Sequence, residues 1–199
     1  MGVLDQFRSA KRGLQLHPAD IDVRKLFPMF APAKFFKSGG WPGPYILPGA
    51  EGVGITWALD LPNGAMRYLD QSMRAHWEAT GVDWKAAALA KLHEASKERL
   101  FTHGLERKNG RLFAVAMMHP DGWGPSRLLL HEALQQIFPQ GYRVSIPEMS
   151  CGVAMSRELE EKEEATITGM IAKCFGEGTR PLAPGIFEPD EVLPNWSVV

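Results

Sequence analysis

Histidine and cysteine are the residue types in this chain best suited to acid–base, metal or nucleophilic chemistry. The six histidines are His17, His76, His93, His103, His119 and His131. No two of them have the i,i+4 spacing of a helical zinc site, and the HExxH motif is absent. The sequence therefore predicts no metal site, and it implies no cofactor.

One histidine lies in a turn that directly follows an apolar run. The run covers residues 112–118, and His119-Pro120-Asp121-Gly122 ends it. Sheet proteins often carry functional groups where a buried strand ends, but Asp-Gly is also favourable turn chemistry. A catalytic and a purely structural interpretation therefore both remain open. If the protein is an enzyme, its site is expected at the 119–127 turn and the 147–150 loop. The candidate catalytic residues are His119, Asp121, Arg127 and Glu148.

The two cysteines, Cys151 and Cys174, are too few for a disulfide framework and match no CxxC motif. Cys151 opens an alternating strand pattern, which favours a side chain that faces the core. Cys174 shares a helical face with Ile167 and Ile171, which indicates a buried, inert thiol. The chain also lacks the GxSxG and GxxxxGK[ST] motifs of common nucleophile and phosphate sites.

Three tryptophans lie in proline- and glycine-rich surroundings: Trp41, Trp123 and Trp196. Exposed tryptophan and arginine side chains form many binding hot spots. Trp123 with Arg127, one helical turn later, is therefore a candidate binding patch. The alternative is that these rings cover the core beneath loops.

Residues 110–156 have the clearest secondary-structure pattern in the chain, which predicts a β-α-β-β unit. A short unbroken apolar run fits a strand buried on both faces, Pro125 suits a helix start, and strict alternation indicates half-buried strands. The predicted elements are a strand at 112–118, a helix at 125–137, strands at 142–146 and 151–155, and a hairpin loop at 147–150.

The flanking segments add a hairpin and several helices. Alternating residues predict a strand at 53–61, and Pro62-Asn63-Gly64 predicts a hairpin turn into a second strand at 65–69. Asp and Ser side chains can cap the first free amides of a helix, and they predict where the following helices begin. The remaining predicted elements are a helix at 73–80 capped by Asp70 or Ser72, an alanine-rich helix capped by Asp83, a helix whose first turns hold the charged run 157–164 and which ends at Gly176, and a short strand near 186–187. An acidic tail is the alternative interpretation of that charged run.

The first fifty residues are harder to assign. Residues 27–49 are dense in proline and glycine, which predicts an irregular segment with a short strand at 34–37, after a short helix at 4–16. The interleaved aromatic residues argue against a solvated linker. We therefore expect this segment to pack on the domain.

Composition indicates one soluble globular domain. The chain has 199 residues, of which 45% are hydrophobic and 23% charged. The expected class is α+β, with a mixed, largely antiparallel sheet and helices packed on it. Residues 1–50 would form the irregular lead-in, 51–187 the core and 188–199 a loose tail.

Charge and hydropathy limit the expected partners and location. A net charge of −1 gives no basic excess for nucleic acid. No apolar run approaches the ~18 residues of a membrane span, and the N-terminus lacks a signal-peptide core. We therefore expect a cytoplasmic protein that binds neither nucleic acid nor membranes.

Two stretches resemble the YtpQ-like family of bacterial proteins. They are LDLPNGAMRYLDQSMRAHWEATGVDWKAAALAKLHEA, and DGWGPSRLLLHEALQQIF followed by YRVSIPEMSCGVAMS. The likeness covers residues 53–187 and implies an α+β domain with no established activity. At Glu148-Met149-Ser150 the chain departs from the family pattern, so the resemblance transfers no site to that loop.

The absence of a catalytic signature favours a non-enzymatic binding or protein-interaction module. The expected partner is another protein, or a second copy of the chain in a homodimer. The alternative is the small enzyme with the scattered polar site named above.

Overall fold

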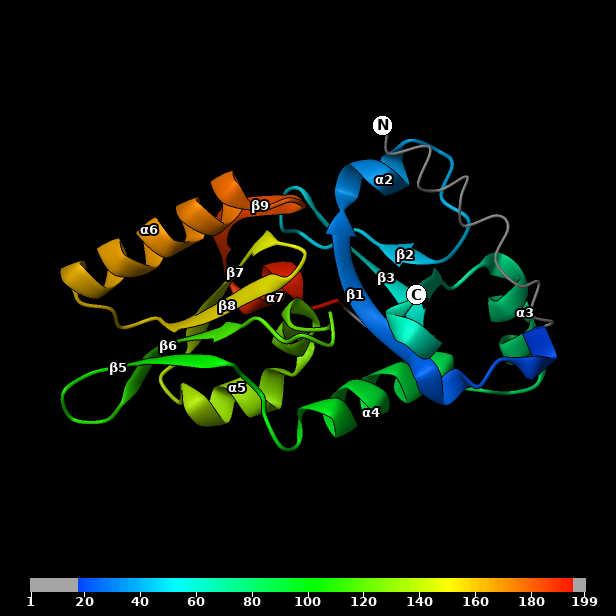
Figure 1. The fold of residues 1–199 in the computed structure, drawn as a ribbon, viewed down its shortest axis with the longest axis horizontal. Coiled ribbons are helices and arrows are strands. Elements are labelled where there is room, and N and C mark those ends of the chain that lie inside the picture. Colours follow the sequence, from blue (N-terminus) through cyan, green and yellow to red (C-terminus); the bar gives the residue numbers. More distant parts are fainter. Residues whose placement is uncertain (1–17, 195–199) are drawn as a thin grey trace.

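The computed structural model describes residues 18–194, which fold into two antiparallel sheets with helices packed on them (Figure 1). Every strand pairing in this part of the chain is antiparallel. The predicted α+β class is therefore confirmed, with two sheets where the sequence suggested one. The helix predicted at 4–16, His17 and Trp196 lie outside the described residues.

The first sheet, sheet A, is built around β3 (Val53–Asp60). On one side β3 pairs with β1 (Leu26–Pro32), and on the other with β2 (Tyr45–Ile46) and β4 (Met66–Tyr68). β2 and β4 follow one another along the same edge of β3, because β2 pairs with residues 55–56 and β4 with residues 58–60. The predicted hairpin through residues 62–64 is confirmed.

Strand β1 corrects the expectation of an irregular lead-in. Its two prolines suggested a break, but β1 is an outer strand of sheet A, where proline is tolerated. The Ala33 N–H donates to Gly52 O at 2.9 Å, so amides of odd-numbered residues point toward β3. Amide direction alternates along a strand, so the amides of even-numbered residues face away from β3. Proline has no N–H, and at positions 28 and 32 this removes no hydrogen bond to β3.

The strand expected at 34–37 is wrong as well. This segment forms the short helix α2 (Ala33–Lys37), which begins directly after Pro32. Phe36 on α2 lies over Gly54 of β3, where a Cβ added to the glycine would be only 2.2 Å from Phe36 Cε2. Packing against sheet A therefore decides the conformation of this segment.

The second sheet, sheet B, has the strand order β5-β6-β8-β7-β9. Its strands are β5 (His103–Glu106), β6 (Leu112–Met117), β8 (Cys151–Ser156), β7 (Tyr142–Glu148) and β9 (Pro181–Phe187). The predicted β-α-β-β unit is present with two changes. The helix divides at Leu130 (φ −86°, ψ 66°) into the 3₁₀ helix η5 (Pro125–Leu129) and α5 (His131–Ile137). β7 extends to Glu148, so only residues 149–150 remain as the hairpin loop.

The other helices begin largely where their caps predict. Asp70 caps α3 (Gln71–Ala79), and Asp83 caps α4 (Trp84–Ser96). Glu160 and Glu163 form a capping box at the start of α6 (Glu161–Glu177). Short 3₁₀ turns complete this set: η2 (Pro18–Asp20), η3 (Val23–Lys25) and η4 (Pro62–Gly64).

The tail is more ordered than expected as far as residue 194. It forms α7 (Pro189–Val192), and Glu191 O accepts a 2.8 Å hydrogen bond from the Ala50 N–H. Val192 is buried against the core. The tail therefore fastens the segment before β3 to sheet B.

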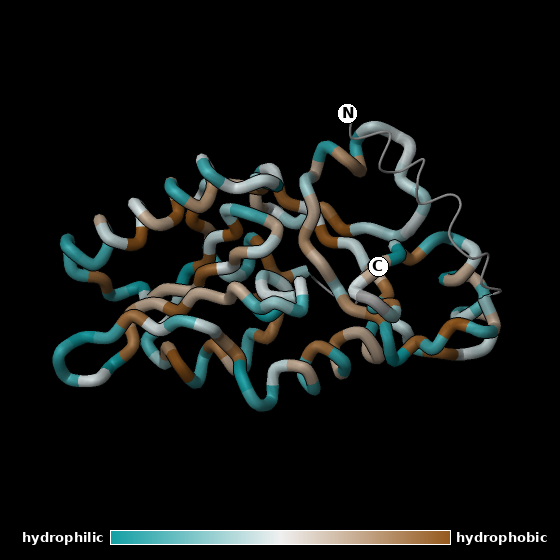
Figure 2. The backbone as a smooth tube through the Cα atoms, in the orientation of Figure 1, coloured by the Kyte–Doolittle hydropathy of each residue, from teal (hydrophilic) through white to brown (hydrophobic). Residues whose placement is uncertain are grey.

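One hydrophobic core joins the two sheets. It contains Phe27 and Ile55 from sheet A together with Met117 and Val144 from sheet B. The Phe27 and Trp123 rings stack with centroids 4.4 Å apart. Figure 2 shows the hydrophobic residues along the strands, and hydrophilic ones along the β5–β6 loop. Among residues 18–194, no helix has the length and apolarity needed to cross a membrane.

Candidate functional site

The 119–127 turn connects the end of β6 to η5 by a tight backbone path. Gly122 has φ 80°, a left-handed conformation that glycine adopts without strain. A Cβ on Gly124 would be 2.4 Å from Met117 O, so only glycine fits there. The path brings Asp121 back over η5, close to Arg127.

Asp121 and Arg127 form a bidentate ion pair. Arg127 Nη2 donates to Asp121 Oδ2 at 2.6 Å, and Nη1 donates to Oδ1 at 3.3 Å. Nη2 also donates to Ala95 O in α4 at 3.0 Å, and the Trp123 N–H donates to Asp121 Oδ1 at 2.9 Å. The Arg127 side chain is 1% exposed and that of Asp121 37%. The pair therefore ties the turn to the end of α4.

The pKa of Asp121 is set by opposing effects. Burial favours the neutral acid, but the hydrogen bonds from Arg127 and the Trp123 amide, with the charge of Arg127, outweigh burial. The net result is a pKa below the usual 3.8. Asp121 is therefore held as a carboxylate, a state suited to an ion pair rather than to a proton donor.

His119 is buried beside this pair, with Nε2 3.2 Å from Leu100 O. Burial lowers its pKa below 6.5, and the nearby charge of Arg127 lowers it further. The contact with a backbone carbonyl gives the ring a structural role: it fastens the turn to the segment before β5.

The predicted Trp123–Arg127 binding patch is wrong. Trp123 is 2% exposed and stacks on Phe27 inside the core, and Arg127 is equally buried. A surface patch needs side chains that a partner can reach. The alternative interpretation from the sequence, a ring that covers the core beneath a loop, describes Trp123.

Glu148 lies apart from the other three candidates. Its Oε2 accepts from the Ser150 N–H and Oγ, both at 2.5 Å, and its Oε1 accepts from the Arg180 N–H at 3.0 Å. A Cβ on Gly178, just after α6, would be 2.5 Å from Glu148 Cγ. The carboxylate therefore closes the β7–β8 turn against β9, and the structure does not assemble the four predicted residues into one site.

Neither of two surface hollows formed by residues 18–194 is lined by the candidate residues. One, of about 410 Å³, lies at the α3–α4 junction around Trp84, and the other, of about 570 Å³, lies between η3, the end of β3 and α4. Within residues 18–194, no cluster of three or more His, Cys, Asp or Glu side chains could hold a metal ion.

Aromatic side chains gather instead on the face of sheet A that α2 covers. Phe36 stacks on Tyr45 with centroids 4.8 Å apart, and both Phe36 and Tyr68 make edge contacts with Trp41, at 4.9 and 4.7 Å. Leu47 lies beside them, because a Cβ on Gly54 would be 3.4 Å from Leu47 Cδ2. We call these five residues the aromatic surface.

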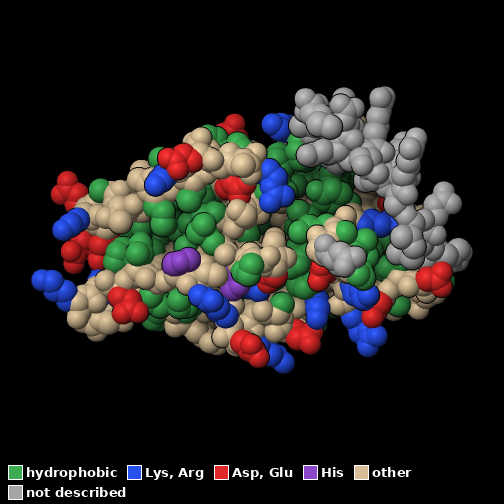
Figure 3. Space-filling view, in the orientation of Figure 1, with side chains coloured by type: hydrophobic (Ala, Val, Ile, Leu, Met, Phe, Trp, Pro, Cys, Tyr) green, Lys and Arg blue, Asp and Glu red, His purple; other side chains and the backbone are tan. Residues whose placement is uncertain are grey.

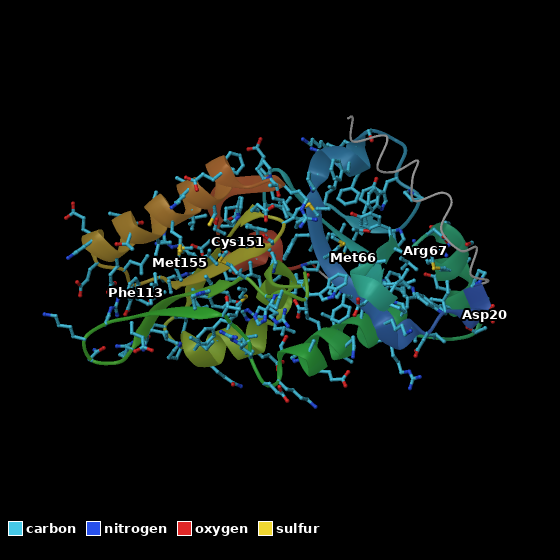
Figure 4. The ribbon with its side chains drawn as sticks, in the orientation of Figure 1. Asp20, Met66, Arg67, Phe113, Cys151 and Met155 are labelled. Atoms are coloured by element: carbon cyan, nitrogen blue, oxygen red, sulfur yellow. The ribbon has the colours of Figure 1, made fainter. Side chains whose placement is uncertain are left out.

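Part of the aromatic surface is open to solvent. Tyr45 is 42% exposed and Leu47 43%, while Phe36 beneath them is buried. Met66, which Figure 4 labels in β4 of the same sheet, is also exposed. Its Cε would be 2.8 Å from a Cβ on Gly122. An exposed side chain that rests on a buried ring is held in place, which is the arrangement that binding surfaces use.

Two close backbone contacts build this surface. A Cβ on Gly43 would be 1.7 Å from Leu69 O, so the loop before β2 crosses directly over the end of β4. The lack of a side chain on Gly54 leaves the space that Phe36 fills. From the sequence we expected the aromatic residues to pack on the domain. The sequence near Tyr45 and Leu47 does not indicate that these side chains are exposed, because their exposure depends on where β2 joins the sheet.

Basic residues lie on the α2 side of the aromatic surface, whereas Glu191 packs on Gly49 near its other end. Residues 26–50 contain Lys34 and Lys37 and no aspartate or glutamate. Both lysines are exposed on α2, on either side of Phe36 in sequence. Arg180 is also exposed, and its charge acts on Tyr68, whose pKa burial raises. A partner with carboxylates would therefore meet favourable charge here.

Comparisons with protein-family models, with curated proteins and with solved structures found no match to this chain. The resemblance to YtpQ-like proteins therefore stays a prediction.

Proposed function

We propose that this chain is a non-enzymatic, cytoplasmic binding module that recognises a protein segment carrying acidic and apolar side chains. The segment binds the aromatic surface through Tyr45 and Leu47. The observation that carries the proposal is their exposure, 42% and 43%, together with the stacking of Tyr45 on the buried Phe36 ring.

The packing beneath these two side chains supports binding. An aromatic ring that is already fixed loses little conformational freedom when a partner covers it, so more of the contact energy remains for affinity. Tyr45 stacks on Phe36, and Phe36 contacts Trp41 in turn. Tyrosine is also one of the residues enriched in binding hot spots.

The surrounding charge supports an acidic protein segment rather than a nucleic acid. Lys34 and Lys37 give the α2 side of the surface local positive charge, while the chain as a whole carries −1. Nucleic-acid binders depend on many phosphate contacts and usually have a basic excess. A single-stranded nucleic acid that stacks on the rings is an outcome that the test must distinguish.

The enzyme alternative has less support. Arg127 pairs with Asp121 and donates to the backbone of α4, and His119 contacts the backbone of the loop after α4. Glu148 lies apart from them and accepts from the backbone next to β9. An enzyme of this kind needs polar groups that converge on a hollow. The two hollows described above lack all four residues.

A photoreactive phenylalanine analogue at position 47, in the full chain expressed in its host cells, tests the proposal. The same analogue at position 118 is the matched control, because Met118 is equally exposed (48%) but follows β6 of sheet B. We expect one protein to crosslink from position 47 and not from position 118. The crosslinked peptide should contain aspartate or glutamate beside apolar residues.

The identified protein must then bind the purified chain directly. Binding should weaken when Tyr45 is replaced by alanine, and also as salt concentration rises, because part of the attraction is between charges. Equal crosslinking from both positions, a nucleic acid in place of a protein, or crosslinks only between copies of this chain would each overturn the proposal.

A further inference from the structure

The two cysteines, which are 23 residues apart in the chain, meet in the fold. Cys151 Sγ and Cys174 Sγ are 3.7 Å apart, and both thiols are free. Cys151 is the first residue of β8, and Cys174 lies in the last turn of α6. From the sequence we expected a core-facing Cys151 and an inert, buried Cys174, and no local pattern indicates their contact.

The elements that carry the thiols pack firmly against each other. Ile167 and Ile171 of α6 are buried with Val153 and Met155 of β8 in one hydrophobic cluster. Cys151 is part of this cluster, and Cys174 packs against it. Figure 4 shows Cys151 and Met155 along β8 below α6, and Figure 3 shows hydrophobic side chains between α6 and the strands. The two sulfur atoms are therefore held together by the core, not by a chance meeting of loops.

The two thiols differ in their access to solvent. Cys151 is buried, whereas Cys174 is partly exposed. Burial raises the pKa of the Cys151 thiol to about 12, with a smaller contribution from Cys174 beside it. Cys174 is thus the thiol that a reagent in solution reaches first, and Cys151 is placed to react second because its Sγ lies 3.7 Å away, once its proton is removed.

We propose that Cys151 and Cys174 are a redox-responsive pair that closes to a disulfide by exchange with small disulfides such as oxidised glutathione. The Cys174 thiolate attacks one sulfur of the small disulfide, forms a mixed disulfide and releases one thiolate. The Cys151 thiolate then attacks Cys174 Sγ, forms the Cys151–Cys174 bond and releases the second thiolate. The protons of the two protein thiols end on the two released molecules, so the protein is oxidised and the small disulfide is reduced.

The required movement is small. A disulfide brings its sulfur atoms to about 2.05 Å, so from 3.7 Å the two Sγ atoms would have to approach by about 1.7 Å, by side-chain rotation and a slight shift of α6. The bond would tie the last turn of α6 to the start of β8. Glu148 packs against Gly178 beside this point, and the link would therefore also fix the junction that leads to β9.

The test is to treat the purified, full-length chain with oxidised glutathione and to measure its intact mass, free thiols and disulfide-linked peptides. The wild-type chain should lose both thiols, gain no glutathione mass and yield a Cys151–Cys174 peptide. Cys151→Ser should stop at a single glutathione adduct on Cys174. Cys174→Ser should keep its buried Cys151 thiol free over the same period. Dithiothreitol should restore both thiols of the wild type.

A thermal melt gives an independent readout. Oxidised wild-type chain should melt several degrees above the reduced form, because the link restricts the unfolded chain, and the serine variants should lose this difference. A wild-type chain that keeps both thiols, holds glutathione on Cys174 beside a free Cys151, or forms disulfide-linked dimers would overturn the proposal. The wild-type result alone decides it, so a variant that fails to fold does not affect the conclusion.

Discussion

At the scale of single residues, the buried Arg127 determines much of the chemistry of the 119–127 turn. Its guanidinium pairs with the Asp121 carboxylate, adds to the effect of burial in lowering the pKa of His119, and donates to the end of α4. A cation this deeply buried is costly unless its partners remain in place. The turn therefore has a structural role, and its polar residues serve stability.

Asp121→Asn tests that role. The substitution keeps the shape of the side chain but leaves Arg127 without its counter-charge in a buried position. We expect the free energy of unfolding at pH 7 to fall by about 1–3 kcal/mol, as measured by urea denaturation. Glu161→Gln, on the exposed first turn of α6, is a control that should change little. A variant as stable as wild type would contradict the structural role of the pair.

The same variant predicts a pH dependence. The pKa of Asp121 is lower in the folded chain than the usual 3.8, so the carboxylate stabilises the fold above that pH. This contribution is lost as pH falls through the lowered pKa of the folded state. The stability difference between wild type and Asp121→Asn should therefore shrink as the pH of the denaturation series falls below about 4. A difference that stays constant down to pH 2 would show that charge is not its origin.

His119 gives a direct spectroscopic check on the burial of the turn. Its pKa should lie below 6.5, since burial and then Arg127 both disfavour the imidazolium. A titration followed by NMR of its ring protons measures this value, with His119→Gln to assign the signal. A pKa at or above 6.5 would mean that the ring is solvated and that the turn is more open than described.

Local chemistry explains which residue roles could be predicted from the sequence. Asp70 and Asp83 were identified as helix caps because a cap depends on the few residues that follow it. Trp123 and Arg127 were open to two interpretations, because their burial depends on Phe27 and α4, which are distant in sequence. The contact between the two cysteines is of the same tertiary kind.

At the scale of elements, the packing of α2 on sheet A is the contact most sensitive to a change in side-chain size. Gly54→Ala would place a methyl group 2.2 Å from Phe36 Cε2, so the ring must move and the aromatic surface must distort. We expect a loss of about 1–3 kcal/mol in unfolding free energy, measured by urea denaturation. Gly169→Ala in α6 is the matched control, because nothing lies within 4 Å of its Cβ.

The control substitution is expected to change the unfolding free energy in the opposite direction. Alanine is favoured over glycine within a helix, so Gly169→Ala should stabilise the chain by about 0.5–1 kcal/mol. Equal effects from both substitutions would show that the contact between Phe36 and Gly54 is not close. The Gly54 variant should also weaken partner binding, whereas the Gly169 variant should leave it unchanged.

The elements that the sequence predicted well are those with an unambiguous period or cap. The alternation over residues 53–61 gave β3, and the charged run followed by an apolar stripe gave α6. β1 was missed because its prolines imitate a break, and only its position at the edge of sheet A makes them acceptable. The helix at 33–37 was missed because five residues carry too weak a pattern.

At the scale of the whole molecule, the shared core predicts that both sheets unfold together. Phe27 and Trp123 stack where the sheets meet, so Trp123→Ala would remove apolar contacts from both. We expect this substitution to cost about 3–5 kcal/mol. Hydrogen exchange measured by mass spectrometry in rising urea should give peptides of β3 and β8 the same midpoint. A midpoint for one sheet well below the other would show two independent units.

The sequence could predict the class of the fold but not its division into two sheets. Alternation and turn residues identify strands, but the choice of neighbour is made by the core that forms between them. The aromatic surface was partly foreseen, since rings interleaved with prolines and glycines indicated packing. Which rings would remain open to solvent followed only from the position of β2 beside β3.

The central claim is that the aromatic surface binds an acidic and apolar protein segment. The most direct test is a calorimetric titration of the segment crosslinked from position 47 into wild type, Tyr45→Ala, Leu47→Ala and Met118→Ala. We expect Tyr45→Ala and Leu47→Ala each to raise Kd at least about tenfold, a loss of roughly 1.4 kcal/mol in binding free energy, while Met118→Ala leaves Kd unchanged. The same Kd for all four chains would contradict the claim.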